Sequence, residues 1–394
     1  MISISGLALI LSVLITGSLS FIFLHQVLEK AGRWGFVDRP SLRKKRQAPI
    51  PRLGGLVLFP GILIGAAITL ILKGQTAKLL GGLIAPIDLC FAVLVGSLSN
   101  MILGLIDDRK GLQAHEKLVV QMITSFVCLQ AIPVPSHLFG VSLDPVIFQL
   151  FFFFWLMIIP NSVNLLDGLD GLSTLLFIGF FLTVSTLWAA QGATSPLLIS
   201  VPILTSLFVF IRYNWNPAKI YLGDSGSQSI GFLIAYFSLI SGMDAHLGSI
   251  TFNPAITFVL TSIWLLDTAM AVGRRFFRWL PNPSVFVESG ELGMKLVKRS
   301  ILNIVKGDLL HLHHKLLHQG WTVKQSSILI AVVAFGWMSL SLTIASENIT
   351  IQSLAWMMFV ISTGGVLMTM HRHMDIQRSL RRRSPKKFKR LPSK

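Results

Sequence analysis

Long apolar stretches separated by short polar segments make up most of this 394-residue chain. A helix that crosses a bilayer needs about 20 mostly apolar residues, because each residue rises about 1.5 Å and the hydrocarbon core is about 30 Å thick. The first stretch has no basic segment before it and no small-residue cleavage site, so we expect a retained helix rather than a signal peptide. The pattern predicts eleven spanning helices, near residues 5–28, 53–72, 87–106, 117–133, 145–163, 172–190, 196–212, 228–243, 254–273, 325–345 and 350–370.

The composition agrees with this pattern. The chain is 53% hydrophobic and only 13% charged, and its mean hydropathy is +0.69. In soluble proteins about a quarter of the residues are charged, so a soluble globular protein is excluded. The sequence predicts an all-α polytopic membrane protein with one membrane domain over residues 1–373, which includes the loop 274–324. A basic cytoplasmic tail, expected to be disordered, follows at 374–394.

The basic residues fix the expected orientation. All of the 34 lysines and arginines except Lys73 and Lys78 fall in alternate loops or in the tail. Cytoplasmic loops carry this excess of positive charge, so we expect the N-terminus outside and the C-terminus in the cytoplasm. The basic tail could contact nucleic acid, but attraction to anionic lipid headgroups is favoured for a segment beside a membrane, and no nucleic-acid partner is expected.

The acidic residues gather on the same predicted side, in short loops or at helix ends. Ionisable groups at membrane depth are costly and usually functional. An ion or lipid transporter would more often place carboxylates at mid-membrane, where Asp267 is the one good candidate. The distribution favours chemistry at the inner membrane surface, in cytoplasmic loops. The acids in question are Asp38, Asp107, Asp108, Asp167, Asp170, Asp224 and Asp308.

Adjacent carboxylates end the third apolar stretch, at Asp107 and Asp108. Such a pair repels itself unless a cation lies nearby, so it suits Mg²⁺ or a basic side chain, although it could also be a solvated helix end. Lys117 could hold a phosphate or anchor the next helix at the interface. Residues 161–171 are more specific, because two Asn, two Asp and two Gly in eleven residues offer hard oxygen ligands and close backbone approach.

The segment 214–227 ends in Gly-Asp-Ser-Gly-Ser and enters a helix. The serines could cap that helix, whose N-terminus is also an anion site, and Asp224 beside it could carry a cation that bridges a pyrophosphate. The cluster of His311, His313 and His314 could suggest zinc, but the neighbouring acids favour a hard metal, and histidines that donate hydrogen bonds to phosphate are the favoured interpretation.

These stretches resemble the polyprenyl-phosphate N-acetylhexosamine-1-phosphate transferases, a membrane family (glycosyltransferase family 4) that also contains phospho-MurNAc-pentapeptide transferase. The resemblance covers essentially the whole chain. It depends on five motifs in the same order, which are Asp38-Arg39-Pro40 with Arg43, Lys44 and Arg52; Asp107-Asp108 with Lys117 and Gln121; residues 161–171; Asn214 with residues 217–227; and His311-x-His313-His314.

The resemblance implies a multi-pass enzyme of the bacterial inner membrane. It would transfer N-acetylhexosamine 1-phosphate from UDP-N-acetylhexosamine to undecaprenyl phosphate, release UMP and initiate a cell-envelope polysaccharide such as O-antigen or teichoic acid. Mg²⁺ is the implied cofactor, with Mn²⁺ as a substitute. GlcNAc is the default sugar, although the stretch between Arg275 and His311 is longer than usual for the family and leaves the sugar open. A homodimer is left open too.

The resemblance also implies roles for individual residues. Asp107 and Asp108 are the expected catalytic residues, and Asp224 with Asn164 the expected metal ligands. The expected substrate-binding residues are Lys117, Asp167, Asp170, Asn214, His311, His313 and His314, and further lipid-phosphate or nucleotide contacts are expected at Arg43, Lys44 and Arg52. The competing hypotheses are a polytopic lipid or ion transporter and a membrane anchor whose basic tail binds partners.

Overall fold

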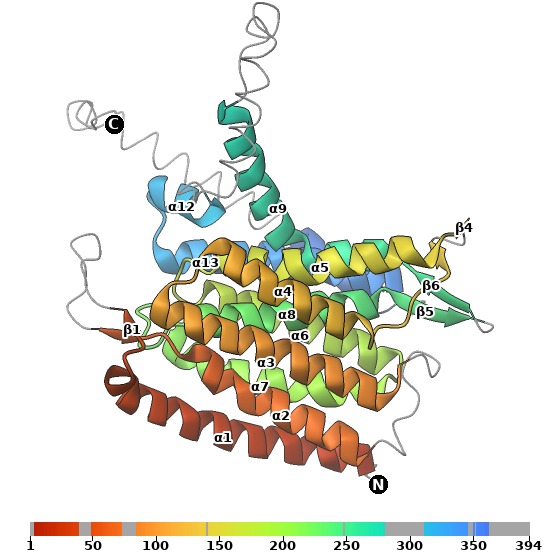
Figure 1. Cartoon of the computed structure of the whole chain (residues 1–394), viewed down its shortest axis with the longest axis horizontal. Helices are drawn as coiled ribbons and strands as arrows, with labels where there is room; N and C mark the ends of the chain where they lie inside the picture. The colour runs from red at the N-terminus through yellow and green to blue at the C-terminus, as the bar shows by residue number, and fades with distance from the viewer. Residues whose placement is uncertain are drawn as a thin grey trace, which may run out of the picture.

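The computed structural model describes residues 4–38, 49–72, 84–138, 141–246, 249–279, 311–345, 350 and 352–361. Most of this part of the chain is helical, and the long helices lie side by side in a bundle (Figure 1). The helices are α1 (Ile4–Trp34), α2 (Gly54–Ile71), α3 (Pro86–Lys110), α4 (Ala114–Leu129), α5 (Pro145–Leu166), α6 (Leu172–Ala190), α7 (Thr194–Asn214), α8 (Gly223–Ser241), α9 (Pro254–Trp279), α12 (Leu312–His318) and α13 (Val323–Ala345). A short apolar helix follows at Gln352–Ile361.

Eight helices in the described part of the chain are long and apolar enough to cross a bilayer, namely α1, α2, α3, α5, α6, α7, α9 and α13. The other three predicted spans correspond to α4, to α8 and to Gln352–Ile361. The first turns of α4 and α8 are polar, because they carry Lys117 and Asp224. The chain is an all-α polytopic membrane protein, whereas the count of eleven spans and the orientation stay predictions.

Short strands lie at both ends of the bundle. At one end β1 (Val37–Asp38) pairs antiparallel with β2 (Ile50–Pro51). At the opposite end a small sheet has the order β4-β3-β6-β5 (Figure 1). Its strands are β3 (His137–Leu138), β4 (Val141–Ser142), β5 (Met243–His246) and β6 (Ser249–Phe252), and β3 pairs in parallel with β6. The strands thus fix loops that leave opposite ends of the helices.

The core is centred on α8. Every residue of α8 from Ser225 to Ser241 is buried, and the helix packs against α2, α3, α5, α6 and α9. By contrast, α4 exposes Val119, Ile123 and Phe126, as expected of a helix that faces lipid. Because α8 is surrounded by other helices, its N-terminus lies within a ring formed by their ends.

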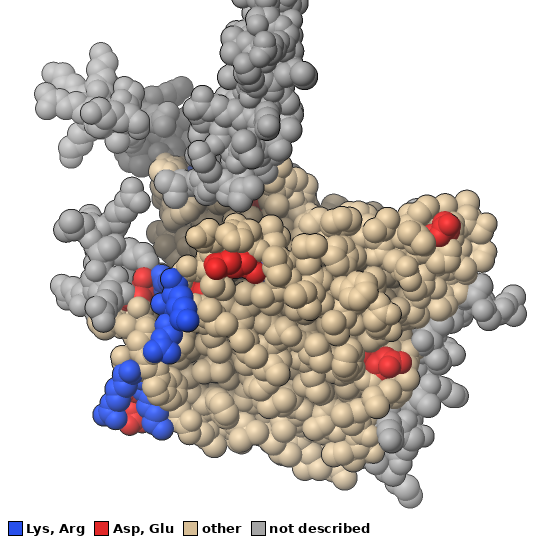
Figure 2. All heavy atoms as spheres, in the orientation of Figure 1, with Lys and Arg blue, Asp and Glu red and all other residues tan. Residues whose placement is uncertain are grey.

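The described basic residues are concentrated at one end of the bundle. On the face in Figure 2, the described Lys and Arg side chains gather at the end of the bundle that carries β1, and a broad uncharged surface extends from there. Several sequence predictions lie outside the described residues, namely Arg43, Lys44, most of the loop 274–324 and the tail 374–394.

Candidate active site

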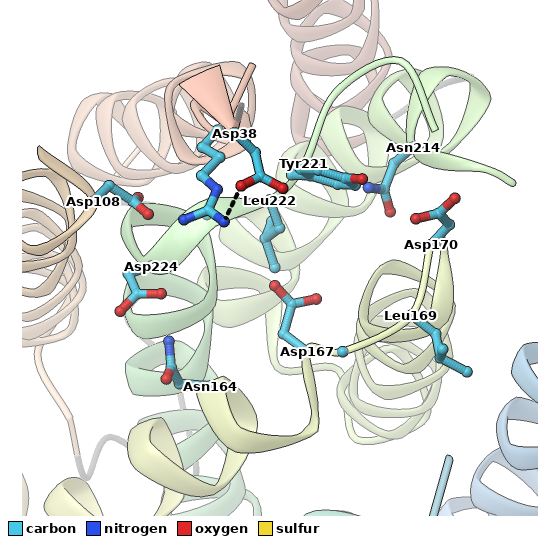
Figure 3. A pocket seen from close by; sticks show the side chains of 13 residues that line it. Asp38, Asp108, Asn164, Asp167, Leu169, Asp170, Asn214, Tyr221, Leu222 and Asp224 are labelled. Carbon is cyan, nitrogen blue, oxygen red and sulfur yellow. Dashed lines mark hydrogen bonds and ion pairs between the residues drawn. The ribbon is translucent and has the colours of Figure 1, made fainter. Parts of the chain in front are cut away.

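A pocket of about 500 Å³ opens at the β1 end of the bundle (Figure 3). The residues that line it come from six separate parts of the sequence, which are β1, the residue after β2, the end of α3, the end of α5 with the α5–α6 connection, the end of α7 and the segment that leads into α8. Its charged lining consists of Asp38, Asp108, Asp167, Asp170, Asp224 and Arg52. The helices therefore bring together most of the acids that the sequence placed on one side of the membrane.

Lys117 joins two of the predicted site residues. Its Nζ lies 3.2 Å from Oδ2 of Asp224 and also forms an ion pair with Asp107. Asp107 is fixed further, because its Oδ1 accepts a hydrogen bond of 2.7 Å from the backbone N–H of Leu112. The ammonium group thus balances two carboxylates from α3 and α8, and this ion-pair cluster borders the pocket.

Asp108 lines the pocket near Asp224 and faces the start of α8 (Figure 3). Its Oδ2 accepts a hydrogen bond of 3.3 Å from the backbone N–H of Ser225. Gly223 takes a positive φ of 72°, and a Cβ there would lie 2.7 Å from Oδ2 of Asp108 and 2.5 Å from the carbonyl oxygen of Arg52. Glycine is therefore required where the chain turns into α8.

Glycines on neighbouring helices let the backbone of α8 approach closely. A Cβ on Gly104 of α3 would lie 2.3 Å from the backbone of Asp224, and one on Gly55 of α2 would lie 2.8 Å from the backbone of Ser225 and Gly226. Real Cβ atoms essentially never come so close. The first turn of α8 is thus clamped between α2 and α3, which fixes Asp224 relative to Asp107 and Asp108.

The segment 161–171 forms a second wall of the pocket. Nδ2 of Asn164 donates a hydrogen bond of 2.8 Å to Oγ of Ser227 on α8. Burial raises the pKa of the Asp167 carboxyl to about 7, and the negative charges of Asp224 and Asp170 act in the same direction. A cation in the pocket would favour the ionised form of Asp167.

Two predicted substrate ligands, Asp170 and Asn214, are used to hold loops. Oδ2 of Asp170 accepts hydrogen bonds from Nδ2 of Asn216 (2.8 Å) and from the backbone N–H of Ala218 (3.1 Å). Oδ1 of Asn214 accepts from Oγ1 of Thr174 (2.7 Å) and from a backbone N–H, and its Nδ2 donates to a backbone carbonyl. Both side chains line the pocket, but their protein contacts give them a role in shaping it.

The histidine cluster packs behind this wall. His313 is 1% exposed, and a Cβ on Gly168, a pocket residue, would lie 2.3 Å from its Nε2. Among the described residues neither ring nitrogen of His313 finds a hydrogen-bond partner, and burial lowers the pKa of this imidazole to about 4. His311 instead pairs with Asp267 of α9, with 2.7 Å between Nδ1 and Oδ2. Asp267 therefore holds the ring of His311 in the histidine cluster.

The sequence reasoning missed part of the pocket. Asp38 was named for its side of the membrane and in a resemblance motif but was given no role at the site, yet it lines the pocket and forms an ion pair of 2.7 Å with Arg52 (Figure 3). Tyr221 also lines the pocket and was not predicted. The signal for Asp38 was available in its resemblance motif, but its contact with Arg52 depends on the pairing of β1 with β2.

The donor set of the pocket fits a hard divalent cation. Within the described residues no cluster of three or more His, Cys, Asp or Glu side chains is close enough to form a complete metal site. The pocket nevertheless presents carboxylate and amide oxygens, which Mg²⁺ prefers, at Asp108, Asp224 and Asn164. Among the described residues that line the pocket, five acids face one arginine, so this lining would repel a phosphate ligand unless a cation accompanied it.

Comparison with known proteins places these residues in a family context. The model of the family described as "Glycosyl transferase family 4" matches residues 90–242. The chain is 31% identical over 328 residues to a decaprenyl-phosphate N-acetylglucosaminephosphotransferase of Mycobacterium tuberculosis, which covers 78% of this chain and 76% of the relative. It is 27% identical over 307 residues to a probable undecaprenyl-phosphate N-acetylglucosaminyl 1-phosphate transferase of Bacillus subtilis, with 76% and 75% covered.

A third relative has a different sugar substrate in its name. The chain is 27% identical over 242 residues to a phospho-N-acetylmuramoyl-pentapeptide-transferase of Staphylococcus saprophyticus, which covers 59% of this chain and 74% of the relative. The matched region of the family model spans the end of α3, the segment 161–171 and all of α8, which supply most of the pocket lining, whereas Asp38 and Arg52 lie outside it.

Proposed function

This chain belongs to glycosyl transferase family 4, and from that membership we propose that it transfers N-acetylhexosamine 1-phosphate from a UDP-sugar to a polyprenyl phosphate. GlcNAc 1-phosphate is the proposed donor group and undecaprenyl phosphate the proposed acceptor, by analogy with the relatives' names. An oxygen of the lipid phosphate forms a bond to the β-phosphorus of the UDP-sugar. The bond between that phosphorus and the bridging oxygen breaks, and UMP leaves with the oxygen.

The acid-lined pocket at the N-terminus of α8 is the observation that carries this proposal. Two anionic substrates have to meet there, so catalysis depends mainly on neutralising and orienting their phosphates. We propose Mg²⁺ as the cofactor, which Asp224 and Asn164 would hold; when bound, it would neutralise negative charge on the diphosphate and on the leaving UMP. The N-terminus of α8, where the backbone N–H of Ser225 already donates to Asp108, adds a positive dipole end at the same place.

We assign the remaining roles to side chains that border the pocket. Asp108 orients or deprotonates the lipid phosphate, and Asp107 holds Lys117, whose ammonium group neutralises charge beside Asp224. The wall that contains Asp167 receives the nucleotide sugar, with the histidine cluster behind it. We propose that the pocket opens to the cytoplasm at the inner membrane of a bacterium, where the lipid tail can stay in the bilayer while its phosphate reaches the pocket.

A transporter is not favoured by these contacts. Its best candidate, Asp267, lies within α9 but accepts hydrogen bonds from His311 and from the backbone N–H of Leu312 at 2.7 and 2.8 Å. A carboxylate that carries ions across a membrane needs to exchange its partners, and Asp267 is instead committed to a structural contact.

The test is an assay of UMP release from membranes that contain the protein. We expect UMP from UDP-GlcNAc only when polyprenyl phosphate and Mg²⁺ are both present, together with a labelled lipid-diphospho-sugar. A panel of UDP-sugars against one acceptor identifies the sugar, because the pocket contacts that differ between sugars change kcat/KM. Full UMP release in excess EDTA would contradict the metal role, and lipid or ion flux without UMP would contradict the transfer.

A further inference from the structure

Three amide side chains from three helices form a buried hydrogen-bonded chain beneath the pocket. Nδ2 of Asn161 on α5 donates to Oε1 of Gln121 on α4 at 2.8 Å. Nε2 of Gln121 then donates to Oε1 of Gln228 on α8 at 2.9 Å. Gln121 and Gln228 are each 2% exposed. We call Asn161, Gln121 and Gln228 the amide relay.

Each member of the relay lies one helical turn from a residue of the site. Gln121 follows Lys117 by four residues, Gln228 follows Asp224 by four, and Asn161 precedes Asn164 by three. Residues three or four apart share one face of a helix. The relay therefore repeats, one turn deeper in the bundle, the arrangement of the side chains that surround the proposed phosphates.

Two polar side-chain contacts join α4 to α8. The backbone of α4 packs against α3 and α5, and long side chains reach from α4 across to α8. Within the described residues, the hydrogen bond of Gln121 to Gln228 and the ion pair of Lys117 with Asp224 are the polar side-chain links between these two helices. Polar groups buried at membrane depth are costly and tend to be retained for function, whereas apolar packing would hold the helices together without them.

Resting on the proposed function, we propose that the amide relay is a positioning device for the transfer reaction. It sets the rotation and depth of α4 against α5 and α8, and thereby the place of Lys117 relative to Asp224 and Asn164. Asn161, Gln121 and Gln228 touch no substrate in this assignment. They act through the residues one turn above them.

Gln121→Met tests the relay, because methionine keeps the length of the side chain and removes both its donor and its acceptor. We expect kcat for UMP release to fall about 10- to 100-fold, as small misplacements of reacting groups do, with the KM for the UDP-sugar little changed. The melting temperature falls too, since Oε1 of Gln228 loses its partner. In Gln121→Met/Gln228→Met no orphaned partner remains, because Asn161 still donates to the carbonyl oxygen of Met157.

The double variant separates positioning from stability. We expect its melting temperature to recover toward that of the wild type while kcat stays low. Ser238→Ala is the matched control, because it removes the buried hydrogen bond of 3.0 Å from Nε1 of Trp155, which joins α5 and α8 away from the site. This control should lower the melting temperature and leave kcat within about twofold of the wild type.

A distance measurement tests the same proposal without catalysis. Spin labels on His115→Cys and Lys219→Cys, both exposed, report the start of α4 against the segment that leads into α8, and the native Cys90 and Cys128 are buried. We expect the distance distribution to broaden or shift in both relay variants and not in Ser238→Ala. An unchanged distribution, or a kcat that recovers together with the melting temperature, overturns the relay. Absence of UMP from the wild type would instead overturn the proposed function.

Discussion

Lys117 is the residue whose interpretation changes most between sequence and structure. From the sequence it could hold a phosphate or anchor a helix at the membrane surface, and spacing alone did not decide between them. In the structure its ammonium group lies between Asp107 and Asp224, which come from α3 and α8. A lysine between two carboxylates neutralises them and leaves less positive charge for a substrate. We therefore propose that Lys117 mainly neutralises these two carboxylates, one of which is the proposed metal ligand Asp224.

Asp224→Asn should lower the rate of UMP release about 100-fold or more, because an amide is a much weaker ligand for a divalent cation than a carboxylate. The protein should still insert, since Lys117 keeps its ion pair with Asp107. Asp144→Asn is the control at the opposite end of the bundle. Asp144 caps α5 by accepting from the backbone N–H of Val146, and asparagine caps helices equally well. Activity in Asp224→Asn close to that of the control would remove Asp224 from the metal site.

At the scale of elements, the site depends on how closely other helices approach the first turn of α8. Gly55 and Gly104 leave no room for a Cβ against the backbone there. Both glycines can be read from the sequence, but the sequence does not say which helix each one faces. That information depends on the rotation of α2 and α3 about their axes, and only the packed structure supplies it.

Gly104→Ala should therefore displace the start of α8. We expect a lower melting temperature and a loss of most UMP release, because backbone atoms of Asp224 and Ser225 cannot move aside as a flexible side chain would. Gly32→Ala is the matched control, since a Cβ on this glycine of α1 meets nothing within 4 Å. Alanine favours helix over glycine, so the control should be as stable as the wild type or slightly more so. Equal effects of the two substitutions on activity would contradict the clamp.

The link between α9 and α12 gives a second prediction for an element. Asp267 accepts from Nδ1 of His311 and from the backbone N–H of Leu312, so it fixes both the ring and the start of α12. Asparagine can keep the backbone contact, but its amide cannot act as the anionic partner of the ring and favours a different tautomer. We expect Asp267→Asn to raise the KM for the UDP-sugar about tenfold, the equivalent of about 1.4 kcal/mol, with a smaller change in kcat.

Two further variants serve as controls for Asp267→Asn. His318→Asn changes an exposed histidine at the end of α12 and should leave both kinetic constants unchanged. Asp267→Ala removes both hydrogen bonds and should cost more than Asp267→Asn. A KM that stays at the wild-type value in Asp267→Asn would show that the tautomer of His311 has no influence on binding of the nucleotide sugar.

For the whole molecule, the sequence predicted the class of fold and most of the pocket. Span length and hydropathy are sufficient for the eight apolar helices, and the alternation of basic loops placed Asp108, Asn164, Asp167 and Asp224 at one end, where the pocket brings them together. The ion pair of Asp38 with Arg52 could not be predicted, because it needs the pairing of β1 with β2. The loop-holding contacts of Asn214 and the amide relay were equally hidden, since they depend on helix rotation.

The orientation of the bundle in the membrane stays a prediction, and cysteine labelling can test it directly. Cys90 and Cys128 are both buried, at 1% and 0% exposure, so a membrane-impermeant maleimide should leave the native chain unlabelled. His115→Cys introduces an exposed thiol beside the pocket, and Val141→Cys introduces one on β4 at the opposite end, where the side chain is 62% exposed.

Because positively charged loops stay in the cytoplasm, we expect Val141→Cys to react in intact spheroplasts and His115→Cys only after the membrane is permeabilised. UMP release in each variant checks that the labelled protein is folded. The reverse pattern would place the acidic pocket outside, away from cytoplasmic UDP-sugars, and the proposed transfer could not take place there. The helices α3 and α5 are long enough to cross the bilayer, so the two ends of the bundle should lie on opposite sides of it. Labelling of both thiols in intact spheroplasts would contradict this separation.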